Sequence, residues 1–298
     1  MNATSVDPQF VSYLREPPRL SYSQPDDSWL SRQLVESVEV LFGRRRVEAI
    51  YHELKSRSLE ITQFFEAALT EARISLNYNQ QALKQIPSQG PLMFVANHPF
   101  GVVDGLALCD LVVKQRGDFR IMLHALLCQD AELAPYFLPI DFKKSPQATR
   151  TNIRSKQLAF KALAADIPVI IFPSGMVSTA GRAGFGKVTD APWTTFAAKI
   201  IREAHATVIP VYFHGQNSRK FHVASYLAEP LRMGLLIHEA LKKFGHTLQM
   251  EIGAPLGWEA LQVHDSRQKL TDFLYAQVQA MGEGRHTPVT ELTVTPAE

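Results

Sequence analysis

The sequence predicts an α/β fold in which helices flank a mostly parallel sheet, with an N-terminal helical segment. The main observation is that, from residue 88, short apolar and partly β-branched runs alternate with longer stretches of helical periodicity. This alternation is typical of parallel strands joined by helices on both faces of a sheet. The expected strands are residues 91–96, 119–123, 168–172, 207–213 and 248–252, and the expected helices are 103–116, 152–166, 193–205 and 231–244.

The pattern divides the chain into four parts. Residues 1–28 are rich in Pro, Ser and Asp and predict an irregular arm. Residues 29–85 carry apolar side chains at helical spacing and predict the helical segment, whose apolar faces either pack on the core or lie on a membrane surface. Residues 86–281 form the expected α/β domain. Residues 282–298 are polar and without apolar periodicity, so they predict a disordered tail.

Composition excludes several classes of protein. The 298 residues carry 31 basic and 29 acidic side chains, a net charge of +2, which argues against nucleic-acid binding but permits a local basic face toward anionic lipid. The sequence has no apolar stretch of about 18 residues and no secretory leader pattern, so we expect peripheral contact with the cytoplasmic face of the cell membrane. Cys109 and Cys128 lie in apolar contexts, which favours buried free thiols in a reducing compartment.

The first chemical motif is Asn97-His98-Pro99. An acidic residue, Asp104, follows six residues after His98. A buried strand ends at Asn97, and the next helix carries Asp104 in its first turn. An aspartate in this place can orient the His98 ring and stabilise its cation while the outer nitrogen takes a proton from a hydroxyl. Taken alone, the same residues are equally consistent with a capped helix.

Two further loops follow expected strands. Phe172-Pro173-Ser174-Gly175 leaves the run at 168–172, and Gly175 allows backbone amides to approach a ligand or an oxyanion, with Ser174 and Ser178 as further donors. The run at 207–213 contains Pro210, which predicts an edge strand or a bulge, and the polar end at Asn217 is expected to face the same pocket. Ligands in such sheets gather at the carboxyl ends of strands, which favours the interpretation of His98 and Asp104 as a catalytic pair.

These three segments, in this order, resemble blocks of the glycerolipid acyltransferase family, which includes the lysophospholipid and glycerol-phosphate acyltransferases. The resemblance covers residues 88–255, and Phe137-Leu-Pro139-Ile140-Asp141 is weakly similar to a further block. It implies that His98 and Asp104 deprotonate an acceptor hydroxyl, which attacks an acyl thioester of coenzyme A or acyl carrier protein. No other cofactor and no metal is implied. The substrate-contacting residues expected from these motifs are Asn97, Pro173, Ser174, Gly175, Ser178, Arg182 and Asn217.

Two departures narrow the resemblance. Five residues separate His98 from Asp104 where the family usually has four, and Ser174 and Val177 replace a glutamate and an arginine. That arginine is expected to meet an acceptor phosphate. Both departures resemble the branch of hemolysin-like and lyso-ornithine lipid O-acyltransferases, as do the segments around Asn152, Gly181-Arg182-Ala183-Gly184, Asp190-Ala191-Pro192-Trp193 and Gly215-Gln216-Asn217-Ser218.

The resemblance therefore implies acyl transfer to a lyso-lipid hydroxyl, with a lyso-ornithine lipid or a related aminolipid as the expected acceptor. Three alternatives stay open: a lysophospholipid acceptor, hydrolysis by the same base, and a non-catalytic lipid- or acyl-carrier-binding protein. Arg182 is expected either to contact an acidic head group or carrier phosphate or to be solvated. The histidines show no metal-ligand spacing, and the sequence has no Gly-x-Ser-x-Gly, Gly-x-Gly-x-x-Gly or P-loop motif.

Overall fold

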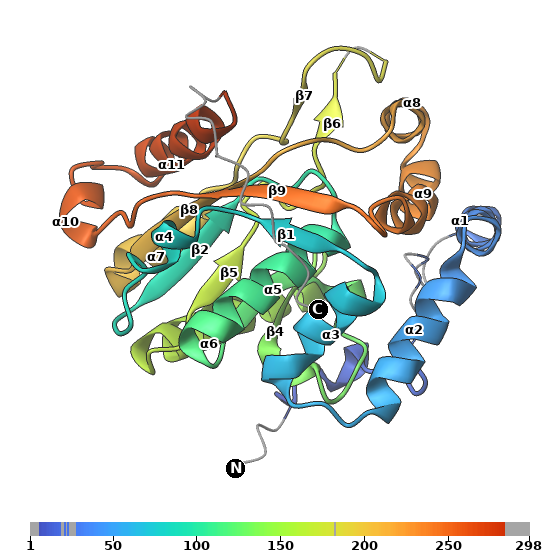
Figure 1. The fold of residues 1–298 in the computed structure, drawn as a ribbon, viewed down its shortest axis with the longest axis horizontal. Helices are drawn as coiled ribbons and strands as arrows, with labels where there is room; N and C mark the ends of the chain where they lie inside the picture. Colours follow the sequence, from blue (N-terminus) through green and yellow to red (C-terminus); the bar gives the residue numbers. More distant parts are fainter. Residues whose placement is uncertain (1–5, 19–20, 22, 24–27, 182, 284–298) are drawn as a thin grey trace, which may run out of the picture.

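A seven-stranded sheet in the order β1-β9-β8-β2-β5-β3-β4 forms the centre of the computed structural model (Figure 1), which describes residues 6–18, 21, 23, 28–181 and 183–283. Neighbouring strands run parallel except for β8 and β9. The predicted mostly parallel sheet is confirmed. The strands are β1 (Ser75–Asn77), β2 (Leu92–Ala96), β3 (Arg120–His124), β4 (Phe137–Ile140), β5 (Val169–Ile171), β8 (Thr207–Phe213) and β9 (Thr247–Ile252).

Helices cover both faces of the sheet because its central strands are apolar on both sides. Every residue of β2 is buried, with Phe94 in the core on one face and Met93 and Val95 in the core on the other. Helices α3 and α5 complete the first core, and α6, α7 and α11 complete the second. The described helices are α1 (Trp29–Leu41), α2 (Arg44–Ser56), α3 (Ile61–Glu71), α4 (Gln80–Leu83), α5 (Val102–Arg116), α6 (Pro146–Ala164), α7 (Phe196–Ala204), α8 (Arg219–Leu227), α9 (Glu229–Leu241), α10 (Trp258–Leu261) and α11 (Arg267–Gly282).

The N-terminal helical segment shares the core of the α/β domain. Phe64, Phe65 and Leu69 of α3 are buried in the same cluster as Phe94. The segment also supplies a strand that the helical periodicity does not predict: Ser75–Asn77 is β1, at the edge of the sheet, parallel to β9. Its partners lie about 170 residues away in the sequence, so a local pattern contains no signal for this pairing. The sequence pattern changes at residue 85, but the residues on either side of it share one hydrophobic core and one sheet.

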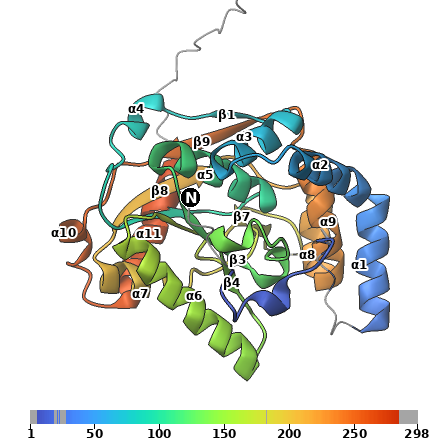
Figure 2. The same ribbon diagram turned by 90° about the horizontal axis from the view of Figure 1, so that it is seen from below.

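Helix α1 packs against α9, and Figure 2 shows the two side by side. The contact is close at Gly234, where a Cβ atom would lie 2.9 Å from Cγ1 of Val38. The opposite side of α1 is exposed to solvent: Trp29, Leu30 and Leu41 are 65%, 71% and 78% exposed. The sequence left core packing and membrane contact open for this helix. In the structure one face packs on α9 and the other carries uncovered apolar side chains.

The described part of the predicted arm lies along α6 and β4. Asp7 pairs with Arg154 of α6 at 2.7 Å, and the hydroxyl of Tyr13 lies 2.9 Å from Oγ1 of Thr151. Among the described residues of the arm, 11–13 form a 3₁₀ turn. Helix α11 ends at Gly282, where the predicted tail begins. From residue 284 onward that tail lies outside the described residues.

Pro210 lies in β8, which is an internal strand between β2 and β9, so the edge-strand alternative is wrong. The bulge alternative is confirmed. Between the pairs Val211–Ile252 and Val208–Leu256, the facing chain has one residue more than β8. The amide of Val208 donates to Leu256, so the nitrogen of Pro210, two residues on, faces the same irregular segment and is not required for the ladder.

Two general features complete the fold. Cys109 and Cys128 are both buried, and neither forms a disulfide. Within the described part of the chain, none of the helices combines the length and apolar composition needed to span a bilayer.

Candidate active site

The three predicted loops meet at one edge of the sheet because β8, β2 and β5 are neighbours and run parallel. Their carboxyl ends lead into the turn at residues 97–101, the loop at 172–178 and the loop at 214–218. The amide of Ser178 donates to the carbonyl of His98 at 2.8 Å, which joins two of the loops directly. The structure therefore brings the backbone of these segments to one edge of the sheet, and their common role in a site stays a prediction.

His98 and Asp104 form a hydrogen-bonded pair. Nδ1 of His98 lies 3.1 Å from Oδ2 of Asp104, and the same oxygen accepts the amides of Phe100 and Gly101 at 2.8 and 3.0 Å. Asp104 lies in the first turn of α5, where the helix dipole favours a negative charge. Burial raises the pKa of Asp104, whereas the His98 ring and the two amides act in the opposite direction. The carboxylate is thus held in place by three donors inside the protein.

The His98 ring is oriented for proton transfer. Because Nδ1 faces the carboxylate, the neutral ring carries its proton there and presents a free lone pair on Nε2. The His98 side chain is 18% exposed and that of Asp104 is fully buried, so a substrate can reach the histidine but not the aspartate. Phe172 stacks on the ring with centroids 4.1 Å apart and fixes its plane. This arrangement is that of an oriented general base.

The extra residue between His98 and Asp104 is accommodated by a glycine turn. Gly101 caps α5 with φ of +80°, a conformation that L side chains rarely adopt. A Cβ atom at this position would also lie 3.3 Å from Cγ2 of Val177. Gly101 therefore allows both the backbone conformation that points its amide at Asp104 and the close packing of the 172–178 loop.

In the loop at 172–178, the hydrogen-bond donors expected to face a ligand bond to the protein itself. The Gly175 amide donates to the Phe172 carbonyl at 2.9 Å, so in this conformation it closes a turn and does not face a ligand. Oγ of Ser174 lies 2.8 Å from the Met176 carbonyl, and the Met176 amide makes only a long contact of 3.5 Å. The Pro173 carbonyl accepts the Thr194 amide. In this conformation, therefore, neither the Gly175 amide nor the Ser174 hydroxyl is available to an oxyanion.

Ser178 belongs to a network that positions the His98 backbone. Its hydroxyl donates to Oδ1 of Asp190, and the same oxygen accepts the His98 amide at 3.2 Å. Oδ2 of Asp190 accepts Nε1 of Trp193 at 2.9 Å. All of these side chains are buried. Asp190 was not among the expected site residues, although the sequence resemblance included its segment.

The remaining expected residues have different surroundings. The Asn97 amide exchanges two hydrogen bonds with the backbone of Phe213, at 3.0 and 2.7 Å, and so ties the end of β2 to the end of β8. Asn217 is buried, and neither atom of its amide has a partner among the described residues. Arg182 lies outside the described residues. Contact of these three residues with substrate stays a prediction.

Similar sequences among known proteins are acyltransferases. A family model described as "Acyltransferase" matches residues 39–282. A lyso-glycine lipid O-acyltransferase from Phocaeicola vulgatus is 32% identical over 206 residues, which is 66% of this chain and 69% of the relative. A second lyso-glycine lipid O-acyltransferase, from Bacteroides thetaiotaomicron, is 29% identical over 60% of this chain and 65% of its own length.

This chain belongs to the acyltransferase family. Among solved structures, the 1-acyl-sn-glycerophosphate acyltransferase PlsC from Thermotoga maritima aligns over 82% of this chain and 84% of its own, with 17% identity and a TM-score of 0.48.

Two cations of the acyltransferase lie beside the site and were not predicted from sequence. Nζ of Lys243 lies 4.0 Å from the ring centroid of Phe100 and 3.2 Å from the carbonyl of Gln216. Arg232 of α9 donates to the Val177 carbonyl at 3.3 Å. Both lie outside the motif segments of the sequence analysis, the last of which ends at Ser218. No local sequence signal therefore marks them.

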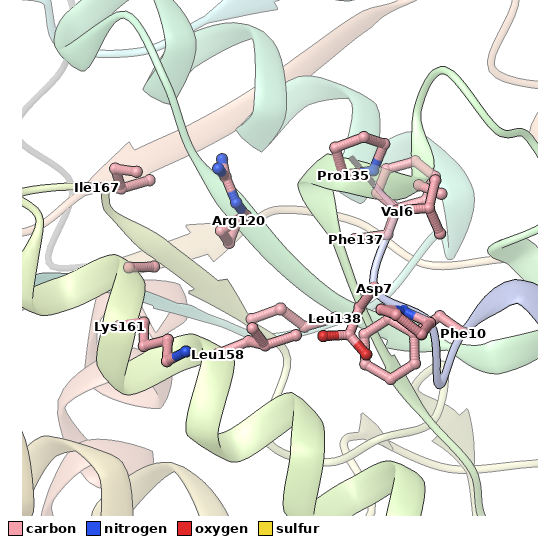
Figure 3. A pocket seen from close by; sticks show the side chains of 13 residues that line it. Val6, Asp7, Phe10, Arg120, Pro135, Phe137, Leu138, Leu158, Lys161 and Ile167 are labelled. Carbon is pink, nitrogen blue, oxygen red and sulfur yellow. The ribbon is translucent and has the colours of Figure 1, made fainter. Parts of the chain in front are cut away.

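A cavity of about 290 Å³ lies at the opposite end of the sheet (Figure 3). Arg120 and Phe137, at the starts of β3 and β4, line it together with Phe10 of the arm and Lys161 of α6. It contains neither His98 nor Asp104 and is not part of the active site. The described residues of the acyltransferase also include no group of three side chains able to hold a metal ion.

The Asp190 network predicts that substitutions at Asp190 and Trp193 do not have independent effects on the stability of the acyltransferase. In Asp190→Asn an amide nitrogen replaces Oδ2 and faces the indole N–H of Trp193, so two buried donors oppose each other. We expect the free energy of unfolding to fall by about 1–3 kcal/mol. Trp193→Phe removes one donor, so the two substitutions together should cost less than the sum of their separate effects. Urea denaturation of the four proteins measures this, and strictly additive effects would contradict the network.

Proposed function

We propose that this acyltransferase moves a fatty acyl group from a thioester of coenzyme A or acyl carrier protein to the hydroxyl of a lyso-lipid whose head group is an amino acid. The observation that carries the proposal is the His98–Asp104 pair at the carboxyl ends of the sheet, in a chain of the acyltransferase family. The relatives described above support a lyso-lipid acceptor through their names.

The geometry supports one proton-transfer sequence. Nε2 of His98 takes the proton of the acceptor hydroxyl as its oxygen attacks the thioester carbonyl. Asp104, 3.1 Å from Nδ1, stabilises the imidazolium that forms. The tetrahedral intermediate then expels the thiolate, the imidazolium returns the proton to that sulfur, and the products are an ester and a free thiol. His98 is neutral again at the end of the cycle.

The proposed acceptor class rests on the sequence of the 172–178 loop and on the names of the relatives. Val177 stands where the glycerolipid acyltransferases that the chain resembles carry an arginine expected to meet a phosphate. An amino-acid head group carries no phosphate, which agrees with this replacement. The sequence favours a lyso-ornithine acceptor, whereas the names of the relatives favour a lyso-glycine acceptor. We therefore propose the amino-acid class and let experiment choose between its members.

The assay uses purified protein, a labelled acyl thioester and one acceptor at a time: lyso-glycine lipid, lyso-ornithine lipid or lysophosphatidate. We expect labelled diacyl product with an amino-acid acceptor and at least tenfold less with lysophosphatidate. Preference for lysophosphatidate would contradict the acceptor class. Release of labelled fatty acid without any acceptor would favour hydrolysis, and binding without turnover of every acceptor would favour a non-catalytic role.

We also propose that the enzyme works at the cytoplasmic surface of the cell membrane, with α1 as one contact. The exposed side chains of Trp29 and Leu30 lie at the start of α1, and the exposed Arg45 and Arg46 lie in α2, which follows it. Apolar side chains and nearby cations are the features that bind peripheral proteins to anionic lipid. The unpaired Cys109 and Cys128 agree with a reducing compartment.

Membrane contact predicts a measurable loss of binding. In Trp29→Ser with Leu30→Ser, the partition coefficient onto anionic vesicles should fall about tenfold or more, since each buried apolar side chain contributes about 1.5–3 kcal/mol. Vesicle sedimentation measures this. Val263→Ser is the matched control, because Val263 is also 71% exposed but lies between α10 and α11. Equal partitioning of all three proteins would exclude α1 as a contact.

A further inference from the structure

The layer beside the active-site turn contains several polar side chains without partners. Val177 of the 172–178 loop packs there with Phe221 of α8 and Leu236 of α9. The buried atoms without a hydrogen-bond partner among the described residues include Nε of Arg232, both amide atoms of Asn217 and Nε2 of His222. Buried polar atoms in proteins are normally paired. Three such side chains on adjoining segments indicate a missing ligand.

Arg232 is the charged member of this set. One nitrogen of its guanidinium lies 3.3 Å from the Val177 carbonyl, and Nε is buried without a partner among the described residues. It precedes Leu236 by one helical turn, and Leu236 reaches within 3.8 Å of the position of a Cβ atom on Gly101. Arg232 is therefore on the face of α9 that approaches the turn holding Asp104. Burial lowers the pKa of Arg232, a destabilisation that a bound anion relieves.

His222 and Asn217 add neutral donors. Burial lowers the pKa of the His222 ring and so favours its neutral form. Nδ1 of this ring accepts the Ala180 amide at 3.4 Å, which places the hydrogen of the neutral ring on Nε2. Both side chains are only 2% exposed. The Asn217 amide supplies a further N–H group in the loop that follows β8. Together the three side chains provide donors and one positive charge.

Glu239, the acid that acts on His222, already has hydrogen-bonding and ionic partners of its own. Glu239 is engaged by the amide and hydroxyl of Ser218, at 2.7 and 2.6 Å, and by Lys242 at 3.0 Å. Glu229 is exposed at the start of α9, and its charge acts against the effect of burial on the pKa of Arg232 without outweighing it. The chemistry therefore suits a carboxylate better than an ammonium group.

We propose that Arg232, together with Asn217 and His222, binds the carboxylate of the acceptor's amino-acid head group. An amino acid joined to an acyl chain through its nitrogen keeps this carboxylate, and a guanidinium binds it through paired hydrogen bonds. The inference rests on the proposed function, since it assigns the part of the site that recognises that acceptor class. It also makes a glycine head group a better fit than ornithine, whose side-chain ammonium group would add a second positive charge beside Arg232.

The test compares two acceptors that differ only in charge: a hydroxyacyl-glycine lipid and its glycinamide analogue, which keeps the chain and the hydroxyl. We expect Arg232→Met to lower kcat/KM for the acid about 10- to 100-fold while changing kcat/KM for the amide less than about threefold. Arg232→Lys should retain part of the preference. Arg219→Met, an equal loss of charge at an exposed position of α8, should leave the ratio unchanged.

The outcomes separate this inference from the proposed function. If the unmodified enzyme transfers acyl groups to neither glycine acceptor but does so to lysophosphatidate, the proposed function and the head-group assignment both fail. If the enzyme is active and Arg232→Met keeps the full preference for the acid, the inference alone is overturned. Equal losses with acid and amide, in both Arg232→Met and Arg232→Lys, would show that Arg232 supports the fold and does not bind the acceptor.

Discussion

His98→Ala is expected to lower kcat by about 10²–10⁴-fold, because it removes the base that takes the proton of the acceptor hydroxyl. The substitution leaves a small polar space next to the ring of Phe172 and a buried carboxylate that keeps the amides of Phe100 and Gly101. The fold should therefore survive. Rates with a labelled acyl thioester and a saturating acceptor, measured together with thermal unfolding, separate loss of chemistry from loss of structure.

A matched histidine provides the control for this prediction. His264 also stacks on a phenylalanine ring, Phe273, with centroids 4.3 Å apart, but it lies between α10 and α11. His264→Ala should retain turnover within about twofold. Near-normal turnover of His98→Ala in a folded protein would remove His98 from the mechanism.

Asp104→Asn is expected to lower kcat by up to about 10³–10⁴-fold while preserving the orientation of the histidine. The two amides of Phe100 and Gly101 select the amide oxygen for the Oδ2 position, so Nδ1 of His98 still donates to an oxygen. What disappears is the negative charge. Two unit charges 3.1 Å apart at an effective dielectric of about 20 interact by about 5 kcal/mol, which sets this upper limit.

The same variant has a cost in stability that the assay must account for. Its NH₂ group replaces Oδ1, which is buried without a partner, so the free energy of unfolding should fall by about 1–3 kcal/mol. Measuring kcat at a temperature well below the unfolding transition isolates the charge effect. If Asp104→Asn retains full turnover, Asp104 only caps α5 and the imidazolium needs no partner.

The His98–Asp104 pair could be predicted because it is local. His98 and Asp104 lie on one strand–turn–helix unit, so the apolar run before them, the glycine and the first turn of the helix already place them near each other. The same holds for α5 and for the central strands, where burial on both faces produces continuous apolar runs. Even so, the two further loops at strand ends were needed to favour an active site over a capped helix.

Other parts of the site could not be predicted because their partners are remote. The Gly175 amide closes its own turn, and Ser178 holds Asp190 instead of facing a ligand, although the residue types alone suggested donors to substrate. Similarly, β1 forms only because β9 offers a free edge. In each case the decisive contact is made by a residue that the local pattern does not contain.

The sequence by itself thus determined the α/β class, the proximity of His98 and Asp104, and the order of the loops that surround them. Only the tertiary structure decided which donors of those loops are free and which cations reach the site. The order β8-β2-β5 brings Asn217, His98 and the 172–178 loop to one edge, and the packing of α9 brings Arg232 to Val177. The physical reason is that periodicity encodes which face of an element is buried, whereas a lone arginine or asparagine gains its role only from the groups that packing places around it.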